Sequence, residues 1–379
     1  MTVQNIKASV LLGAHDLRTI SRELSEPSYG EVQVEVSSTT LCGSDIHYYN
    51  HGANGDFCVR EPLSLGHESA GIIKALGSGV DGFKVGDKVA LEVGIPCDKC
   101  KFCRKGRYNL CKEMRFRSSA KTFPHFQGTL QDRINVPSAW VHKVPTSLKL
   151  EHAALAEPLS VAIHAANRAK VEAGSKVLVM GAGAVGLFSA AVAKAYGATT
   201  VVIADIAQNR LDFAVKNGFA TQSYLVNSGR GTTIEEKLKI CRKIADDLTG
   251  IKDDEEKIGE FDYTFECTGV ESCVQTGIFA TAPGGKLMFV GMGNPIQHLH
   301  IGSAALREVD LLGVFRYANA YPIAIELMAK GKIPALDKIV THKVYGVDDA
   351  SRAFALAGKP QDENGNLVIK VAIVNKDLE

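Results

Sequence analysis

The stretch Lys176-Val-Leu-Val-Met-Gly-Ala-Gly-Ala-Val-Gly186 decides the fold of the second half of the chain. The apolar run that ends at Met180 is typical of a strand buried on both faces of a sheet. A glycine-rich turn follows it, and the Ala-rich segment from Leu187 to Tyr196 predicts a helix. The next strand is predicted at Thr200–Ala204 and the next helix at Gln208–Asn217. This alternation of strands and helices predicts an α/β fold with a parallel, doubly wound sheet.

The sequence on either side of this stretch has a different pattern of apolar, charged and turn-forming residues. Up to about Pro158, short β-like runs alternate with turns that contain Gly and Pro. The charged segment Thr232–Glu260 predicts a solvated helix and loop. After about Val314 comes a short mixed tail. The remaining predicted strands are Val32–Val36, Glu68–Ala75, Val85–Ala90, Ile134–Val136, Phe261–Phe265, Lys286–Val290 and Leu367–Val374, and the tail helix is Ile323–Ala329.

Length, charge and composition restrict the function classes. The chain has 379 residues, enough for two or three domains with cores of their own. Its 43 Lys and Arg nearly balance 42 Asp and Glu, so the charge gives no reason to expect nucleic acid or an anionic membrane as a partner. The beginning of the chain lacks the apolar segment of a secretory signal, and no run is long and apolar enough for a membrane span. We expect a cytoplasmic protein.

The glycine-rich turn matches the pattern G-x-G-x-x-G of dinucleotide-binding proteins. Gly181 permits the tight turn, Gly183 lets the backbone approach a pyrophosphate, and Gly186 lets helix and strand pack closely. Asp205, at the end of the next strand, can accept hydrogen bonds from both ribose hydroxyls and would repel a 2′-phosphate, which favours NAD over NADP. Arg210 keeps NADP as an alternative, because a cation near this position can hold the 2′-phosphate of NADP. The same side chain can instead lie against the adenine. The alternative is a glycine-rich turn that binds nothing.

Two groups of residues have the composition of metal sites. Four of the nine cysteines follow the pattern C-x2-C-x2-C-x7-C, which suits a closed tetrahedral zinc site; an iron–sulfur cluster or disulfides are the alternatives. The second group is dispersed over Cys42-Gly-Ser-Asp-Ile-His47, Gly66-His-Glu68 and Glu157-Pro158. Cys, His and Glu together suit a catalytic zinc with an open position, although each residue alone is more often structural. The four cysteines of the first group are Cys97, Cys100, Cys103 and Cys111.

The order and spacing of these motifs resemble those of the zinc-dependent medium-chain dehydrogenases. The resemblance extends over essentially the whole chain, and within the superfamily it is to the polyol (sorbitol/xylitol) dehydrogenase branch of microbial or fungal type. It implies a GroES-like β-rich catalytic domain, residues 1–158 completed by 315–379, and a Rossmann NAD-binding domain, residues 159–314. The sharper markers of the branch are His47-Tyr-Tyr49, Gly106-Arg-Tyr-Asn-Leu-Cys111, Glu157-Pro-Leu-Ser-Val161 and Val314-Phe-Arg-Tyr317.

The resemblance also implies roles for individual residues. It implies two zinc ions per subunit, a structural one held by the four cysteines and a catalytic one held by Cys42, His67 and Glu68 with a water. Glu157 is implied to contact that water or the substrate, or to enter the metal shell. The residues implied to hold polyol hydroxyls are Tyr48, Arg316 and Tyr317, and those implied to line the nicotinamide are Val185, Val290, Gly291, Met292, Val314, Phe315 and Arg316.

The implied reaction is oxidation of a sugar alcohol of the sorbitol or L-iditol type at C2, with hydride transfer to NAD to give a ketose. Ser44 and His47 are candidates for a relay that passes the released proton outward, or for hydrogen bonds to the cofactor ribose only. The segment Phe116–Gly128 departs from the usual loop beside the substrate, and its Arg117, Lys121 or His125 can either contact substrate or be exposed loop residues.

Other functions stay open from the sequence alone. Xylitol, L-arabinitol or galactitol are alternative substrates, and a simple alcohol or L-threonine would place the chain in a sister branch. A non-catalytic structural or NADPH-binding protein of the same fold is the alternative of a different class. The family also implies a homotetramer.

Overall fold

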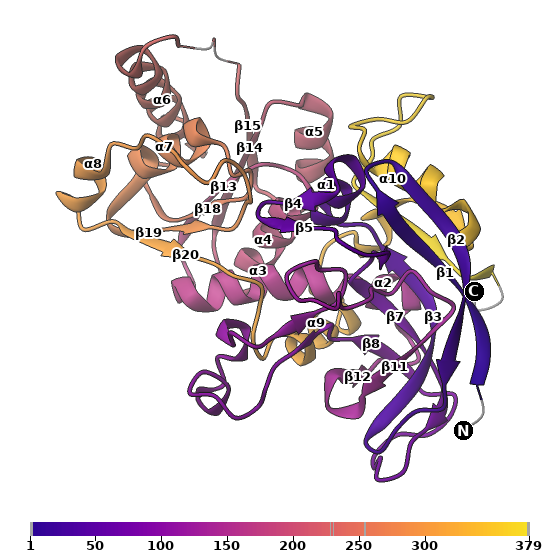
Figure 1. Cartoon of the computed structure of the whole chain (residues 1–379). Coiled ribbons are helices and arrows are strands. Elements are labelled where there is room, and N and C mark those ends of the chain that lie inside the picture. The colour runs from indigo at the N-terminus through magenta and orange to yellow at the C-terminus, as the bar shows by residue number, and fades with distance from the viewer. Residues whose placement is uncertain (1–2, 228, 230, 254, 377–379) are drawn as a thin grey trace. The chain divides into compact units, whose positions relative to one another are not determined.

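The computed structural model describes residues 3–227, 229, 231–253 and 255–376, and the chain divides into two compact units (Figure 1). The first unit contains the chain up to Glu157, Tyr321–Lys330 and the chain from Leu336 onward. The second unit contains Pro158–Ala320 and Gly331–Ala335. Among the described helices, none has the length and apolar composition that crossing a lipid bilayer requires.

The described part of the second unit is built on a parallel sheet with the strand order β15-β14-β13-β18-β19-β20. Numbered along the chain, this is the order 3-2-1-4-5-6 of dinucleotide-binding folds, in which the ligand lies where the order reverses, at the carboxyl end of the first strand. The predicted doubly wound sheet is therefore confirmed. The strands are β13 (Lys176–Met180), β14 (Thr200–Asp205), β15 (Gln222–Leu225), β18 (Phe261–Glu266), β19 (Thr281–Phe289) and β20 (Asp310–Gly313).

The helices of this unit alternate with the strands along the chain. A small hairpin of two short strands directly precedes β18. β14 is buried along its whole length, as its continuous apolar run requires in a sheet covered on both faces. The helices are α3 (Ala156–Ala169), α4 (Ala184–Ala195), α5 (Gln208–Lys216), α6 (Ile234–Thr249), α7 (Glu271–Ala280) and α8 (Ile301–Ala305), and the hairpin is β16 (Lys252–Asp253) with β17 (Glu256–Lys257).

The charged segment after Thr232 folds as an amphipathic helix. Thr233 caps α6 through its side chain, which accepts from the Glu236 backbone N–H in a capping box. Cys241, Ile244 and Leu248 are buried on one face of α6, and the last two belong to the core cluster that includes residues of β13 and β14. The helix is therefore solvated on one face only, because its apolar residues recur at helical spacing.

The first unit is predominantly antiparallel. Its largest sheet has the order β12-β8-β7-β3-β22-β21, with β11 also paired to β3, and a smaller sheet has the order β2-β1-β6. The strands of the large sheet are β3 (Glu31–Thr40), β7 (Glu68–Leu76), β8 (Lys88–Leu91), β11 (Arg133–Pro137), β12 (Val141–Lys143), β21 (Val340–Tyr345) and β22 (Lys370–Val374). The other strands are β1 (Val3–Gly13), β2 (Asp16–Ser25), β4 (Ala53–Asn54), β5 (Phe57–Cys58), β6 (Leu63–Ser64), β9 (Gly94–Ile95) and β10 (Arg115–Phe116).

Short helices complete the first unit: α1 (Gly43–His51), α2 (Leu150–Ala153), α9 (Tyr321–Ala329), α10 (Ala350–Ala357) and the 3-10 turns η1 (Cys103–Lys105), η2 (Tyr108–Leu110), η3 (Ser138–Trp140), η4 (Leu336–Lys338) and η5 (Val347–Asp349). The strand predicted from Val85 begins only at Lys88, because Gly86 is at φ +92° and Asp87 accepts from the Lys84 N–H in a turn. The long hairpin of β1 and β2 had no assignment from the sequence.

Candidate metal and cofactor sites

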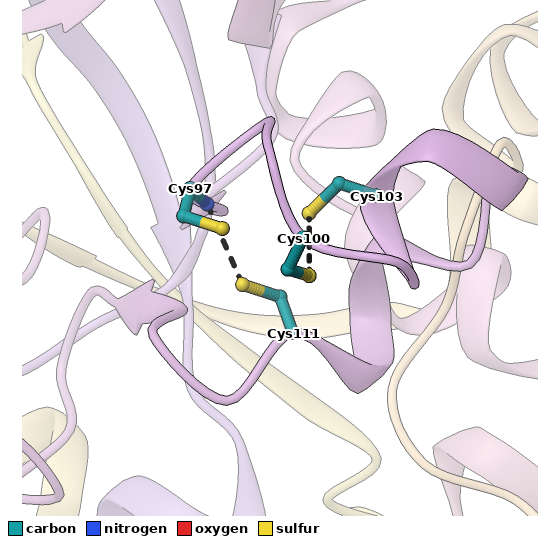
Figure 2. A group of neighbouring side chains, drawn as sticks. All are labelled: Cys97, Cys100, Cys103 and Cys111. Carbon is teal, nitrogen blue, oxygen red and sulfur yellow. Dashed lines mark hydrogen bonds between the residues drawn. The ribbon is translucent and has the colours of Figure 1, made fainter.

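Four cysteines of the first unit bring their sulfur atoms together on a loop between β9 and β10. Figure 2 shows the side chains of Cys97, Cys100, Cys103 and Cys111 pointing toward one another. Their sulfur atoms all lie within 4.8 Å of one another. A tetrahedral zinc ion with Zn–S bonds of about 2.3 Å sets its sulfurs about 3.8 Å apart, so the four donors fit a single ion.

The loop already favours thiolate at one of these positions. A backbone N–H of Cys103 bonds the Cys100 sulfur and lowers the pKa of this thiol to about 7. The Cys100 and Cys103 sulfurs lie 3.4 Å apart, and the Cys97 N–H donates to the Cys111 sulfur at 3.4 Å (Figure 2). A divalent ion bound by these sulfurs would displace the remaining thiol protons.

Cys100→Ser is expected to remove the ion from the loop while turnover largely persists. A hydroxyl is a poor substitute for a thiolate ligand, so the zinc content should fall from about two to about one ion per chain. Atomic absorption measures the zinc content, and thermal unfolding should show a lower midpoint. A variant that keeps both ions would contradict the assignment of this loop.

A second donor group lies where helix α1 meets strands β3 and β7 of the first unit. Cys42 directly precedes α1, His67 directly precedes β7, and Glu68 is the first residue of β7. One ligand atom of each lies within 4.8 Å of the others. Gly66 has φ +89°, and a Cβ there would lie 2.8 Å from the Thr39 side chain, so only glycine turns the chain in this way before His67. The dispersed Cys, His and Glu of the sequence thus converge.

A buried aspartate orients the histidine of this group. Asp45 is fully buried and accepts from His67 Nδ1 at 3.2 Å and from the Ser118 hydroxyl at 2.6 Å. Although burial alone would lower it, the pKa of His67 is raised well above its usual value by Asp45 and Cys42. The bond at Nδ1 leaves Nε2 for a metal ion, the arrangement that fixes ligand histidines in metal sites.

The carboxylate of Glu68 forms an ion pair with a buried lysine that lies far from it in the sequence. Lys370, the first residue of β22, donates to both carboxylate oxygens at 2.5 Å, and the Thr40 hydroxyl donates to one of them. Burial alone would lower the pKa of Lys370, but Glu68, Cys42 and Glu157 raise it above the usual value. Because each carboxylate oxygen has two lone pairs, Glu68 can face both the ammonium group and a metal ion.

The other sequence-predicted residues of the first unit lie on α1 and α3. Ser44 is half-buried and His47 is exposed, with its ring centroid 5.9 Å from that of His51. Tyr48 is buried, and its hydroxyl accepts from the Ala120 N–H at 3.1 Å. Glu157 is buried in the first turn of α3, close enough for its charge to act on Lys370. Tyr48 and Glu157 thus belong to the buried part of this unit, whereas His47 is at its surface.

The backbone of the glycine-rich turn of the second unit is open to close approach at Gly183. Gly181 has φ +99°, and a Cβ at Gly186 would lie 1.8 Å from the Gly181 carbonyl oxygen. A Cβ at Gly183 meets nothing within 4 Å, which leaves open space in front of the turn. Gly183 is the N-cap of α4 and no side chain caps that helix, so its first N–H groups are available to phosphates.

Asp205 connects the glycine turn to the end of β14. Its carboxylate accepts from the Ala182 N–H at 2.7 Å and from the Ala207 N–H at 2.9 Å, one bond to each oxygen. Each oxygen keeps a lone pair for a ribose hydroxyl. Arg210 lies in the first turn of α5, half-buried, in the helix that follows Asp205.

The residues expected to line the nicotinamide lie at the ends of β19 and β20 and on α4. A Cβ at Gly291 would lie 2.4 Å from the backbone nitrogens of Thr268 and Gly269, so this glycine allows two loops to cross. Arg316 has φ +52°, and its guanidinium lies 4.9 Å from the Phe315 ring centroid. Met292 and Phe315 are exposed, Tyr317 is buried, and Val185, Val290 and Val314 are half-buried.

Two of the three candidate residues of the loop Phe116–Gly128 are buried and make hydrogen bonds within the first unit. His125 accepts from the Arg60 N–H through Nε2 and contacts the Thr122 carbonyl through Nδ1. Arg117 is buried and donates to the carbonyls of Gln127 and Asn135. Lys121 is exposed. Arg117 and His125 are therefore not exposed loop residues.

Three residues of these sites had no role assigned from the sequence. Asp45 lies within the Cys42–His47 motif, so its position in that motif could have indicated a role in the site. Lys370 is 302 positions from Glu68, and nothing near it in sequence points to the site. Glu266 is fully buried, accepts from the Thr268 and Gly269 N–H groups, and fixes the loop after β18.

Comparison with known proteins gives matches over both units. Residues 28–146 match the family model of the alcohol dehydrogenase GroES-like domain, and residues 184–330 match that of the zinc-binding dehydrogenases. The sorbitol dehydrogenase of Gallus gallus is 39% identical over 353 residues, 93% of each chain. The probable D-xylulose reductase A of Emericella nidulans is 39% identical over 355 residues, again 93% of each. The crystal structure of L-idonate 5-dehydrogenase from Escherichia coli superposes with a TM-score of 0.85 at 27% identity, over 98% of this chain and 99% of that one.

The first two of these relatives each cover 93% of the chain, and the residues matched by the GroES-like family model, 28–146, include both donor groups. The GroES-like and Rossmann folds predicted from the sequence are confirmed by the family models and the structural neighbours. The chain belongs to the zinc-dependent medium-chain dehydrogenases, in the branch that contains sorbitol dehydrogenases and D-xylulose reductases.

Proposed function

We propose that the protein is an NAD-dependent polyol dehydrogenase that oxidises a sugar alcohol of the sorbitol or L-iditol type at C2 to a ketose. The observation that carries the proposal is the convergence of Cys42, His67 and Glu68 on one point, with ligand atoms within 4.8 Å of one another. It is supported by relatives named sorbitol dehydrogenase and D-xylulose reductase. The reaction removes one hydride and one proton from the substrate carbinol, and the products are a ketose, NADH and the proton.

When bound, zinc polarises the reacting hydroxyl and NAD accepts the hydride. Cys42, His67 and Glu68 would hold the metal ion, and Asp45 keeps the His67 ring in the required orientation through Nδ1. Lys370 and Thr40 hold Glu68 in place from its other side. The four cysteines of the loop would hold a structural ion, since their closed set leaves no open position.

Substrate and proton handling are proposed for the residues around this centre. Glu157 is proposed to face the substrate or the metal-bound water, and its burial next to Lys370 supports a place in the same polar cluster. Ser44 and the exposed His47 are proposed to pass the proton to solvent along α1. Tyr48, Arg316 and Tyr317 are proposed to hold the hydroxyls of the polyol.

Initial rates of NADH formation with a panel of substrates test the proposal. The panel is sorbitol, xylitol, L-arabinitol, galactitol, ethanol and L-threonine, each with NAD before and after a chelator. We expect chelator-sensitive rates with at least one polyol. Turnover of ethanol or threonine alone would move the chain to a sister branch, and silence on the whole panel would overturn the proposed reaction.

Asp205→Ala is expected to relax the preference for NAD. The ratio of kcat/KM for NADP to that for NAD should rise by about tenfold or more, because the carboxylate would no longer repel a 2′-phosphate. Steady-state kinetics with both cofactors measures this ratio, and Asp212→Ala on the exposed side of α5 is the control. An unchanged ratio would refute the role proposed for Asp205.

We further propose a cytoplasmic homotetramer. The free state of all nine cysteines supports a reducing compartment. Light scattering of the purified protein measures the subunit number.

A further inference from the structure

Two arginines and one aromatic ring form a cluster on the first unit that the proposed reaction does not use. Arg115 and Arg117 stand two positions apart on and just after β10, so their side chains project to the same side of the strand. Each guanidinium carbon lies 4.5 Å from the centroid of the Phe126 ring. The two guanidinium carbons therefore lie no more than twice 4.5 Å apart. The contacts of both groups with the ring offset part of the repulsion between their charges.

In the part of the chain that the structure describes, no carboxylate lies within ion-pair distance of Arg117. Its side chain is buried, with the residue 6% exposed, and two of its N–H groups donate to the carbonyls of Gln127 and Asn135. Burial and the charge of Arg115 lower the pKa of Arg117 to about 10, against a smaller effect of Glu31. Among the described residues Arg117 makes no ion pair, and a buried cation without a counter-charge is costly. Some of its five donors remain for a ligand.

A cavity opens in front of this cluster. It has a volume of about 250 Å³ and is lined by Arg115, Arg117, Phe126 and Asn135, with Glu31 also on its wall. Water takes about 30 Å³ in the liquid, so the cavity has room for an oxyanion and part of the group that carries it. The wall of the cavity contains two arginines and one glutamate, so its net charge is positive.

We propose that this cavity binds a phosphate-type oxyanion, either free phosphate or the phosphate group of a small metabolite. The planar guanidinium fork matches phosphate oxygens, and the charge-assisted bonds would compensate the buried cation of Arg117. The site is separate from both donor groups. It adjoins the catalytic one along the chain: Phe116 packs with its ring centroid 5.6 Å from that of His67, and the Ser118 hydroxyl donates to Asp45.

Isothermal titration calorimetry of the zinc-loaded protein tests the proposal. Saturating NADH is present throughout, because it fills the phosphate-binding turn of the second unit. Orthophosphate and a hexose 6-phosphate are titrated separately in a buffer without phosphate. We expect saturable binding, and a tighter constant for the hexose phosphate would identify the metabolite as the source, whereas equal constants would identify free phosphate.

Three variants connect the binding to this cavity. Arg115→Gln removes an exposed charge and should weaken binding by about tenfold or more, as loss of a charged contact does. Glu31→Gln removes the opposing carboxylate and should tighten binding, a gain that damage to the fold cannot produce. Arg242→Gln is the matched control, since Arg242 also lies over a phenylalanine ring, that of Phe279 at 4.1 Å, and it should leave binding unchanged.

The proposal would be overturned by either of two results. One is the absence of saturable phosphate binding in the wild-type protein. The other is binding that Arg115→Gln leaves unaltered, which would place the anion elsewhere on the chain.

Discussion

Cys42→Ser is expected to lower kcat for the preferred polyol by about a thousandfold or more while the fold persists. Cys42 is the one sulfur ligand of the proposed catalytic donor group, and its loss weakens both metal binding and the several kcal/mol of charge stabilisation that a metal ion supplies. The loop of four cysteines is untouched, so zinc content should fall toward one ion per chain. Stopped-assay kinetics and atomic absorption on the same preparation measure both effects.

Cys58→Ser is the matched control for this experiment. Cys58 is an exposed free thiol on β5 and belongs to neither donor group. It should leave kcat and zinc content at wild-type values. If Cys42→Ser retained wild-type turnover with one ion per chain, the catalytic role of this donor group would be wrong.

Lys370→Met is expected to destabilise the zinc-depleted protein by about 3–5 kcal/mol, the cost of removing one partner from a buried ion pair. The side chains of Lys370 and Glu68 are 5% and 1% exposed, so the carboxylate left behind has no access to water. Urea denaturation measures the loss. It should be smaller in the zinc-loaded protein, because a metal ion beside Glu68 compensates the same charge.

The pH dependence of this effect follows from the raised pKa of Lys370. A lysine whose pKa is raised in the folded state contributes its full stabilisation below the usual value of 10.5 and loses it above. The contribution of Lys370 to the stability of the wild type should therefore be complete at neutral pH and decrease only in strong alkali.

Two further variants separate the ion pair from a general loss of stability. Lys243→Met breaks a pair with Asp247 of 2.6 Å whose side chains are 75% and 38% exposed, and it should cost less than about 1 kcal/mol. Adding Glu68→Gln to Lys370→Met should recover part of the stability, because the unpaired charge is gone. Equal losses in the single and double variants would mean that the unpaired carboxylate is not the source of the destabilisation.

Patterns confined to a short stretch of chain were sufficient for much of the fold. The apolar run before Gly181 predicted β13 as observed, because a strand covered on both faces tolerates few polar residues. The spacing of Cys97 to Cys111 similarly predicted a metal site, because residues so close in sequence converge through a single loop. Where the pattern was locally weak, as in β1 and β2, the sequence made no assignment.

The dispersed donor group depended on the resemblance to a family, because no local pattern connects Cys42 with His67. Pairing of β3 with β7 places Thr40 opposite Glu68, and the turn at Gly66 sets His67 beside Asp45. These contacts are consequences of sheet register, which is fixed by the packing of whole strands.

The sequence by itself determined the doubly wound sheet, the glycine-rich turn and the four-cysteine loop, each of which is encoded within a few tens of residues. Only the tertiary structure decided that Lys370 neutralises Glu68, that Asp45 orients His67, and that Arg117 is a buried cation facing a cavity. The physical reason is that burial and charge compensation depend on distances in space, and the large sheet of the first unit brings together residues such as Glu68 and Lys370, which are 302 positions apart in sequence.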